Sequence, residues 1–272
     1  MSMDNRPIGV FDSGLGGLTA ARELMHLLPG EDIIYFGDTA RVPYGGRSPE
    51  TILKFARQDM NFLCSFDLKA VVIACGTVST TSLSILRQEY DLPIIGVVEP
   101  TALKAAQCTK NGKIGLIATA ASIHSGAYEK AVTSEKADAQ VLGKACPLFV
   151  PLVENGRFRA GDPVIEIVAQ EYLQCMKEFG VDTLMLGCTH YPLLSDVIGK
   201  IMGPDVTLIN SGREAALALK SLLEERGALA ENGAGDTSYF VSDTVDGFEK
   251  MASLFLRSDL KGMVQQINIE KY

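Results

Sequence analysis

Short runs of apolar, mostly β-branched residues alternate along the chain with longer stretches in which apolar residues recur three and four positions apart. The short runs are typical of buried strands, and the longer stretches are typical of helices with one buried face. Strands are expected at residues 7–12, 32–37, 70–75, 93–98, 113–118, 183–188, 206–210 and 238–243. Helices are expected between them, for example at residues 19–28, 50–66 and 163–180. Apolar strands that alternate with helices predict parallel sheets covered on both faces, and therefore the α/β fold class.

Three segments in the first part of the chain have counterparts further on, in the same order. IGVFDSG, which starts at Ile8, resembles IGLIATA, which starts at Ile114, and VVIACGT resembles LMLGCTH. PIIGVVEPTAL and VTLINSGREAAL follow these two segments in turn. The repeat predicts two similar α/β domains related by pseudo-symmetry, with the active site in the cleft between them. The expected domains are residues 1–98 together with 209–272, and residues 99–208.

Composition narrows the class of protein. The chain has 272 residues, of which 47% are hydrophobic and 21% are charged, as is ordinary for a globular protein. The net charge of −8 argues against a nucleic-acid partner, which would normally meet a basic surface. The N-terminal segment MSMDNRPIGVFDSG has no basic-then-apolar leader, and no stretch is long enough for a membrane span. We therefore expect a cytoplasmic protein without a membrane partner.

The chain has six cysteines, and a cytoplasmic protein keeps its thiols reduced. None of them forms a Cys-x-x-Cys pair, so no metal site is expected. Cys64, Cys108 and Cys175 lie in helix-like stretches, and Cys146 lies in ACPLF. Small core residues are the expected role for these four, because free cysteine is usually buried and inert.

Polar residues follow several expected strands where each strand ends, in DSGLGG, DTARVPYGG, CGTVSTTS and CTHYP. In open parallel sheets, ligands bind beyond these carboxyl ends. Asp, Ser, Gly and Thr also make turns and helix caps, so these segments alone do not establish a site. SGLGG lacks the G-x-G-x-x-G spacing, and a dinucleotide cofactor is therefore not supported.

Turn chemistry does not explain Cys75 and Cys188, which stand at equivalent strand ends. A thiolate is a base, with a free pKa of about 8.5 that falls at a helix N-terminus. Each cysteine precedes a polar stretch that looks like a helix start, where an anion is favoured. Two thiols on opposite sides of one cleft can take a proton from one face of a carbon and return one to the other face. Such a pair predicts inversion of a stereocentre without a cofactor.

The segments IGVFDSGLGGLT, GDTARVPYG, VIACGTVS, ACPLFVPLVENG, LMLGCTHYPLL and INSG cover nearly the whole chain. In this order they resemble the glutamate racemases of the cofactor-independent aspartate/glutamate racemase superfamily. The resemblance implies two α/β domains around the active site, glutamate as substrate, no cofactor, and a homodimer as one oligomeric state. It also implies that the product, D-glutamate, supplies peptidoglycan synthesis.

The resemblance further implies roles for individual residues. Cys75 and Cys188 are the two catalytic bases, each serving one enantiomer. Asp12 and His190 lie beside them and assist proton transfer, and Glu154 adds a carboxylate near the cleft. The residues expected at the bound substrate are Asp12, Ser13, Pro43, Tyr44, Gly45, Gly76, Thr77, Thr189 and His190.

One position departs from the family, whose commoner motif at the first cysteine is Cys-Asn-Thr. Here Gly76 takes the place of the asparagine. We expect this position to face the cleft, where an asparagine amide could contact the substrate and the glycine offers only its backbone N–H.

Several alternatives remain open. The substrate could be aspartate or a hydantoin instead of glutamate. A Cys–His hydrolase would use Cys188 as nucleophile and His190 as base, although the second matched cysteine argues against it. A non-catalytic binding protein for acidic amino acids would not need the cysteine pair. Asp12 could serve only as a helix cap, and Glu154 could be a surface carboxylate.

Overall fold

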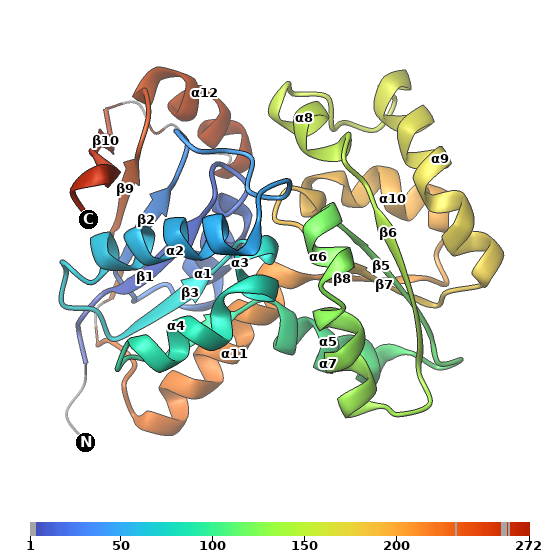
Figure 1. Cartoon of the computed structure of the whole chain (residues 1–272), viewed down its shortest axis with the longest axis horizontal. Coiled ribbons are helices and arrows are strands. Elements are labelled where there is room, and N and C mark those ends of the chain that lie inside the picture. Colours follow the sequence, from blue (N-terminus) through green and yellow to red (C-terminus); the bar gives the residue numbers. More distant parts are fainter. Residues whose placement is uncertain (1–3, 232, 257–259, 261) are drawn as a thin grey trace.

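The computed structural model describes residues 4–231, 233–256, 260 and 262–272, and it contains two parallel sheets (Figure 1). Sheet A contains, in spatial order, β10 (Val264–Gln266), β9 (Thr237–Val241), β2 (Ile33–Gly37), β1 (Ile8–Asp12), β3 (Ala70–Ile73) and β4 (Ile94–Gly96). Sheet B contains β6 (Gln140–Ala145), β5 (Lys113–Ala118), β7 (Thr183–Leu186) and β8 (Thr207–Asn210). All neighbouring strands run parallel. The predicted α/β class is confirmed.

Helices cover both faces of each sheet. One face of sheet A packs against α1 (Leu18–Leu27), α11 (Ser211–Arg226) and α12 (Val245–Leu256), and the other against α2 (Pro49–Leu63), α3 (Gly76–Thr81) and α4 (Leu83–Glu89). Sheet B has α8 (Phe149–Glu154), α9 (Pro163–Phe179) and α10 (Ser195–Met202) on one face. Its other face carries α5 (Val98–Cys108), α6 (Ala120–His124) and α7 (Ala127–Glu135). Short 3₁₀ turns, η1 (Tyr191–Leu194) and η2 (Ile269–Lys271), complete the described elements.

The two sheets share one topology, as the sequence repeat predicts. The order β2-β1-β3-β4 in sheet A recurs as β6-β5-β7-β8 in sheet B. The matched sequence segments therefore occupy matched strands: β1 with β5, β3 with β7, and β4 with β8. The last part of the chain returns to sheet A through β9 and β10. The exact domain boundaries, after residues 98 and 208, stay a prediction.

Two strands were not expected from the sequence, and both lie at sheet edges. The residues of β6 are all exposed or half-buried, so its segment QVLGKA has no continuous apolar run. β10 has only three residues, two of them exposed. Edge strands are often short and polar because one side of the strand faces solvent.

Local sequence explains where the longest helices begin and end. α2 begins after Ser48, whose side chain accepts a hydrogen bond from the backbone N–H of Thr51, with proline as the first helical residue. α9 begins after Asp162, which caps Val164 in the same way, and it ends at Gly180, whose φ is 77°. Glycine adopts that left-handed conformation without steric cost.

The half of the protein built on sheet A and the half built on sheet B approach each other closely. Thr19 on α1 donates a hydrogen bond to the backbone carbonyl of Thr189 at 2.7 Å. A Cβ at Gly16 would lie 2.2 Å from the Thr189 hydroxyl and 2.5 Å from Nδ1 of His190, which is closer than real Cβ contacts. The glycine-rich loop after β1 is therefore required for this approach.

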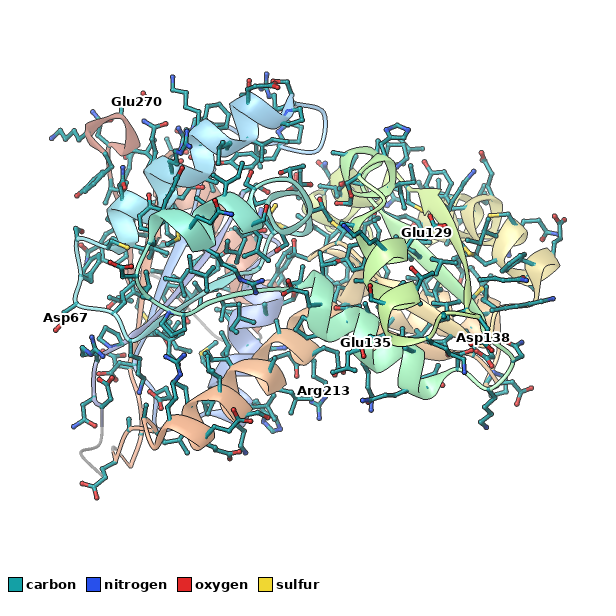
Figure 2. All side chains as sticks on the ribbon, turned by 60° about the horizontal axis from the view of Figure 1, so that its bottom comes forward. Asp67, Glu129, Glu135, Asp138, Arg213 and Glu270 are labelled. Atoms are coloured by element: carbon teal, nitrogen blue, oxygen red, sulfur yellow. The ribbon has the colours of Figure 1, made fainter. Side chains whose placement is uncertain are left out.

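Many of the charged side chains lie on the outside of both halves. Figure 2 shows Asp67 and Glu270 around sheet A, Glu129 and Asp138 around sheet B, and Arg213 on α11. All five are exposed. In the part of the chain described here, no helix is long and apolar enough to cross a membrane.

Candidate active site

A small cavity lies between the carboxyl ends of the two sheets, where open parallel sheets bind ligands. Its volume is about 40 Å³. Its lining residues come from both halves: Ser13, Val42, Pro43, Tyr44, Gly45, Cys75, Gly76, Thr77, Thr119, Val150, Glu154, Gly187, Cys188, Thr189 and His190. Every site residue expected from the sequence is in this set except Asp12, which is fully buried directly before Ser13.

Cys75 is buried and occupies the N-cap position of α3. Its thiol donates to the hydroxyl of Ser13 at 3.6 Å. Burial, and then the charge of Asp12, raise the pKa of Cys75 to about 12. The expectation that a helix N-terminus lowers this pKa is therefore wrong, because α3 has only six residues and burial outweighs its effect. Cys75 is a neutral thiol at neutral pH.

The two carboxylate oxygens of Asp12 have different environments. Oδ2 accepts hydrogen bonds from the backbone N–H groups of Gly14 at 3.1 Å and Gly17 at 3.0 Å. This oxygen therefore orders the loop before α1, but it does not cap the helix, whose N-cap residue is Gly17. Oδ1 is buried and has no hydrogen-bond partner among the described residues. Burial raises the pKa of Asp12, while His190 and the loop N–H groups partly offset this effect.

Cys188, His190 and Glu154 form a chain of contacts on the other side of the cavity. Sγ of Cys188 lies 3.8 Å from Nδ1 of His190, and Nε2 of His190 lies 3.0 Å from Oε1 of Glu154. Burial by itself lowers the pKa of His190, but the contacts with Cys188 and Glu154 outweigh it and raise that pKa to about 10. The ring is then an imidazolium at neutral pH, and it places a positive charge beside the Cys188 side chain.

The local structure after Cys188 differs from the expected helix start. Thr189 and His190 follow the cysteine, and the next element is the 3₁₀ turn η1 instead of an α-helix. A four-residue turn contributes little dipole. The positive charge beside Cys188 is therefore that of His190, and the two cysteines have different electrostatic surroundings.

The hydroxyls at the cavity come from both halves. Thr77 and Thr119 lie across from each other, with 3.1 Å between their side-chain oxygens. Thr119 was not expected from the sequence, although the repeat pairs it with Ser13 at the same place after the matched strand. Val42, Val150 and Gly187 also line the cavity without having been expected, although all three lie in segments that resemble the family.

Tyr44 lines the cavity, but its hydroxyl makes its hydrogen bonds elsewhere instead of being available to a substrate. Its hydroxyl lies beside the carboxylates of Asp38 and Asp59, at 3.1 Å from Oδ2 of Asp59. The ring is buried. The hydroxyl is therefore engaged elsewhere, and the backbone at this position is what it can offer to a ligand.

Gly76 lines the cavity, but a side chain there would not extend toward a substrate. A Cβ at Gly76 would lie 2.5 Å from the backbone carbonyl oxygen of Gly187. Gly76 is in the first turn of α3 and is not among the glycines with positive φ. The expectation that this position offers space for a substrate-binding amide is therefore wrong in this structure. The absence of a side chain lets the two halves meet beside both cysteines.

Among the described residues, the other cysteines and the possible metal ligands form no second reactive site. All six cysteines are free, and Cys64, Cys108, Cys146 and Cys175 do not line the cavity. Cys146 is buried, and its thiol donates to the backbone carbonyl of Lys144 at 3.6 Å. Among the residues with described positions, no group of three or more His, Cys, Asp and Glu is placed to hold a metal ion.

Comparisons with known proteins agree over most of the chain. The family described as Asp/Glu/Hydantoin racemase matches residues 18–219. A glutamate racemase from Geobacter metallireducens is 44% identical over 266 residues, which are 97% of each chain. A glutamate racemase isoform from Bacillus anthracis has a TM-score of 0.92 at 40% identity, with 97% of this chain and 98% of that chain covered. A glutamate racemase from Francisella tularensis, solved in complex with D-glutamate, has a TM-score of 0.91 at 38% identity, with 99% and 100% covered.

Proposed function

The chain belongs to the Asp/Glu/hydantoin racemase family, and on that premise we propose that it interconverts L- and D-glutamate. The observation that carries the proposal is the pair of buried cysteines, one from each half, at a single cavity. Relatives named glutamate racemase match nearly the full length, and one of them was solved with D-glutamate. These names favour glutamate over aspartate or a hydantoin as the substrate.

In the proposed two-base mechanism, the cysteines start in opposite protonation states. The Cys188 thiolate takes the proton from Cα of one enantiomer, so the C–H bond breaks and an S–H bond forms. The Cys75 thiol gives its proton to the opposite face of the carbon, which forms the other enantiomer. The enzyme is left with a thiol at Cys188 and a thiolate at Cys75, which is the state that acts on the product enantiomer. No cofactor takes part.

The neighbouring groups support these proton transfers in the proposal. His190 stabilises the Cys188 thiolate, and Glu154 holds the imidazole ring through the 3.0 Å contact. Oδ1 of Asp12, which is buried and has no partner among the residues with described positions, is an acceptor for the substrate ammonium group or for a proton near Cys75. Fixed hydrogen-bond donors around a dry cavity are the groups that stabilise charge developing on a substrate carboxylate. The proposed donors are the hydroxyls and backbone N–H groups of Ser13, Tyr44, Gly45, Gly76, Thr77 and Thr189, beside Pro43.

Substrate entry in this proposal involves a movement of the two halves relative to each other, because both halves supply the lining of the cavity. Closure after entry would exclude water and bring both thiols to the substrate carbon.

The wider role follows from the family. We propose a cytoplasmic enzyme whose D-glutamate supplies peptidoglycan synthesis, with glutamate as its small-molecule partner and with no nucleic-acid or membrane partner. The net charge of −8 supports the absence of a nucleic-acid partner. A homodimer is part of the same proposal.

The deciding experiment is incubation of the purified protein with L-glutamate and, separately, with D-glutamate, without added cofactor. The optical rotation of both reactions, which starts with opposite sign for the two enantiomers, should decay toward zero. Parallel reactions with aspartate and a hydantoin test the alternative substrates, and glutamate binding without turnover would support the binding-protein alternative.

The cysteine roles are tested by Cys75→Ala and Cys188→Ala. Each variant should lose racemisation by more than about 10²–10⁴-fold, the usual contribution of a positioned acid–base group, because neither thiol can reach both faces of the carbon. Cys175→Ala, on α9 and away from the cavity, is the matched control and should keep wild-type rates. Near-normal rates in both directions for Cys75→Ala would show that the two-base mechanism is wrong.

A further inference from the structure

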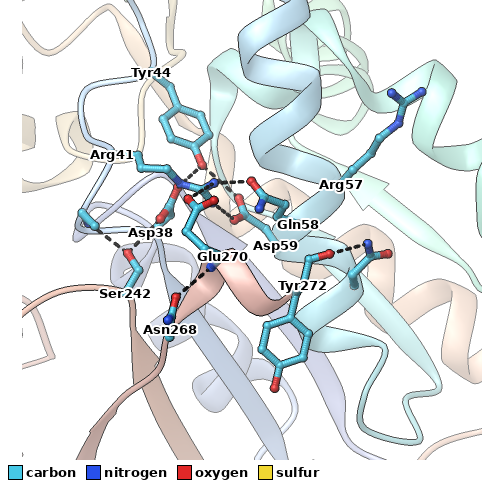
Figure 3. Close-up of polar contacts among 12 residues, drawn as sticks. Asp38, Arg41, Tyr44, Arg57, Gln58, Asp59, Ser242, Asn268, Glu270 and Tyr272 are labelled. Carbon is cyan, nitrogen blue, oxygen red and sulfur yellow. Dashed lines mark hydrogen bonds and ion pairs between the residues drawn. The ribbon is translucent and has the colours of Figure 1, made fainter.

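A buried polar cluster lies on the loop that joins β2 to α2 (Figure 3). Nε of Arg41 donates to Oδ2 of Asp38 at 2.6 Å, and Nη2 of Arg41 donates to Oδ1 of Asp59 at 3.0 Å. The hydroxyl of Tyr44 contacts both carboxylates. Both aspartate side chains are 0% exposed, and Arg41 is only 10% exposed. Asp38, Arg41, Tyr44 and Asp59 are called the loop cluster below.

The loop cluster joins parts of the chain that are far apart in sequence. Asp59 lies on α2, and the hydroxyl of Ser242, directly after β9, donates to Oδ1 of Asp38 at 2.8 Å. Glu270 in η2 lies 3.8 Å from Arg41. The guanidinium of Arg41 also stacks 4.2 Å from the ring centre of Phe55 on α2. The loop is therefore attached to α2, to the end of β9 and to the C-terminal turn.

The attachment matters because the same loop forms one wall of the cavity. Val42, Pro43, Tyr44 and Gly45 are consecutive lining residues, and Arg41 and Tyr44 bracket the first two. The side chains of Val42 and Pro43 are exposed, so apolar packing does not fix them. Within this wall, Tyr44 is the one fully buried side chain, and its hydroxyl ends in the loop cluster.

The charged groups of the loop cluster are paired with one another. Burial, and then the neighbouring charge of Asp38, raise the pKa of Asp59 well above its usual range. Arg41 donates to both carboxylates, and its positive charge partly offsets the raised pKa of Asp59. Burial also raises the pKa of Tyr44, which stays a neutral phenol and can donate a hydrogen bond. A paired, hydrogen-bonded cluster avoids the penalty of an unpaired buried charge.

We infer that the loop cluster is a positioning device for the active site: Asp38, Arg41, Asp59 and the Tyr44 hydroxyl hold the backbone of residues 42–45 where the substrate binds, without touching the substrate. This inference rests on the proposed racemase function. In this inference, the backbone groups of residues 42–45, which line the cavity, contact the substrate in the ground state and in the transition state alike. Loosening them therefore raises KM and leaves kcat nearly unchanged.

The test is Tyr44→Phe, which removes the hydroxyl but keeps the ring, its contact with Phe55 and the backbone N–H. The KM for both enantiomers should rise by about tenfold, corresponding to about 1.4 kcal/mol of binding, with kcat within about twofold of wild type. The matched control is Tyr90→Phe. Its hydroxyl also bonds to α2, with Asn61 at 2.8 Å, but it lies outside the cavity lining. This control should leave KM unchanged.

A second pair of variants separates positioning from folding. Asp59→Asn keeps the shape of the side chain and polar atoms at both positions that contact Arg41 and Tyr44, and it should keep a KM close to wild type. Asp59→Leu removes the hydrogen bonds and should raise KM as Tyr44→Phe does, at a melting temperature that shows a folded protein. If Asp59→Leu does not fold, the comparison of Tyr44→Phe with Tyr90→Phe still decides.

Two outcomes would overturn the inference in a wild-type protein that racemises glutamate. One is an unchanged KM for Tyr44→Phe, and the other is a fall in kcat at constant KM. A wild-type protein without racemase activity would instead refute the proposed function, so the two failures are distinguishable.

Discussion

Gly76→Ala tests whether the spacing of the two halves controls the chemical step. The added Cβ would lie 2.5 Å from the backbone oxygen of Gly187, and ordinary contacts begin at 3.4 Å. The two backbones must therefore separate by 0.9 Å, the difference between these distances. Gly76 directly follows Cys75, and Gly187 directly precedes Cys188, so the separation falls between the two thiols. A misplacement of about 1 Å can cost about 10²-fold in rate.

We therefore expect kcat to fall by about 10²-fold in both directions, with a smaller change in KM. Steady-state racemisation of each enantiomer, followed by optical rotation, gives both constants. The matched control is Gly199→Ala in α10, where the new Cβ would meet only Leu208 at an ordinary 3.8 Å. This control should keep wild-type rates and unfold at a slightly higher temperature, since alanine stabilises a helix by roughly 0.4–1 kcal/mol relative to glycine. A folded Gly76→Ala enzyme with kcat within twofold of wild type would refute the reasoning.

Three other predictions concern pH, cofactors and stability. The rate should fall as pH rises through about 10, because His190 then loses the positive charge that stabilises negative charge developing beside Cys188 during proton transfer, and His190→Asn should lower the rate at neutral pH and remove this alkaline fall. Activity should survive dialysis against a chelator without pyridoxal absorbance; activity that is lost and then restored by zinc would contradict a cofactor-free mechanism. Lys69→Met should lower the free energy of unfolding by about 3–5 kcal/mol in urea titrations, because Glu31 would stay buried without its charged partner. The double variant with Glu31→Gln should recover much of this loss, and a single-variant loss below about 0.5 kcal/mol would show that the pair is dispensable.

Much of the fold could be predicted because buried parallel strands have a strong sequence pattern. The runs that end at Cys75 and Cys188 are apolar throughout, and the repeat indicated that they occupy equivalent strands. β6 escaped prediction because an edge strand needs to bury only part of its surface, and QVLGKA shows no clear period. Thr119 could have been found from the same repeat, through its match with Ser13.

The parts of the site that could not be predicted depend on distances between segments far apart in the chain. The effect of Gly76 depends on the approach of Gly187, which is 111 positions away. The raised pKa of Cys75 depends on its complete burial, which a strand-end motif does not reveal. The direction of the Tyr44 hydroxyl depends on the position of Asp59 on α2.

Sheet A combines strands from the first part of the chain with β9 and β10 from the last part, and this affects folding during synthesis. All strands of sheet B lie within residues 113–210, so they leave the ribosome before β9, which pairs with β2. Until residues 237–241 emerge, the outer edge of β2, a strand buried along its whole length in the finished protein, has no partner. An open, apolar strand edge can pair with other chains. Chains that end before residue 237 should therefore aggregate through sheet A. Limited proteolysis of such chains should detect a second half that is already folded.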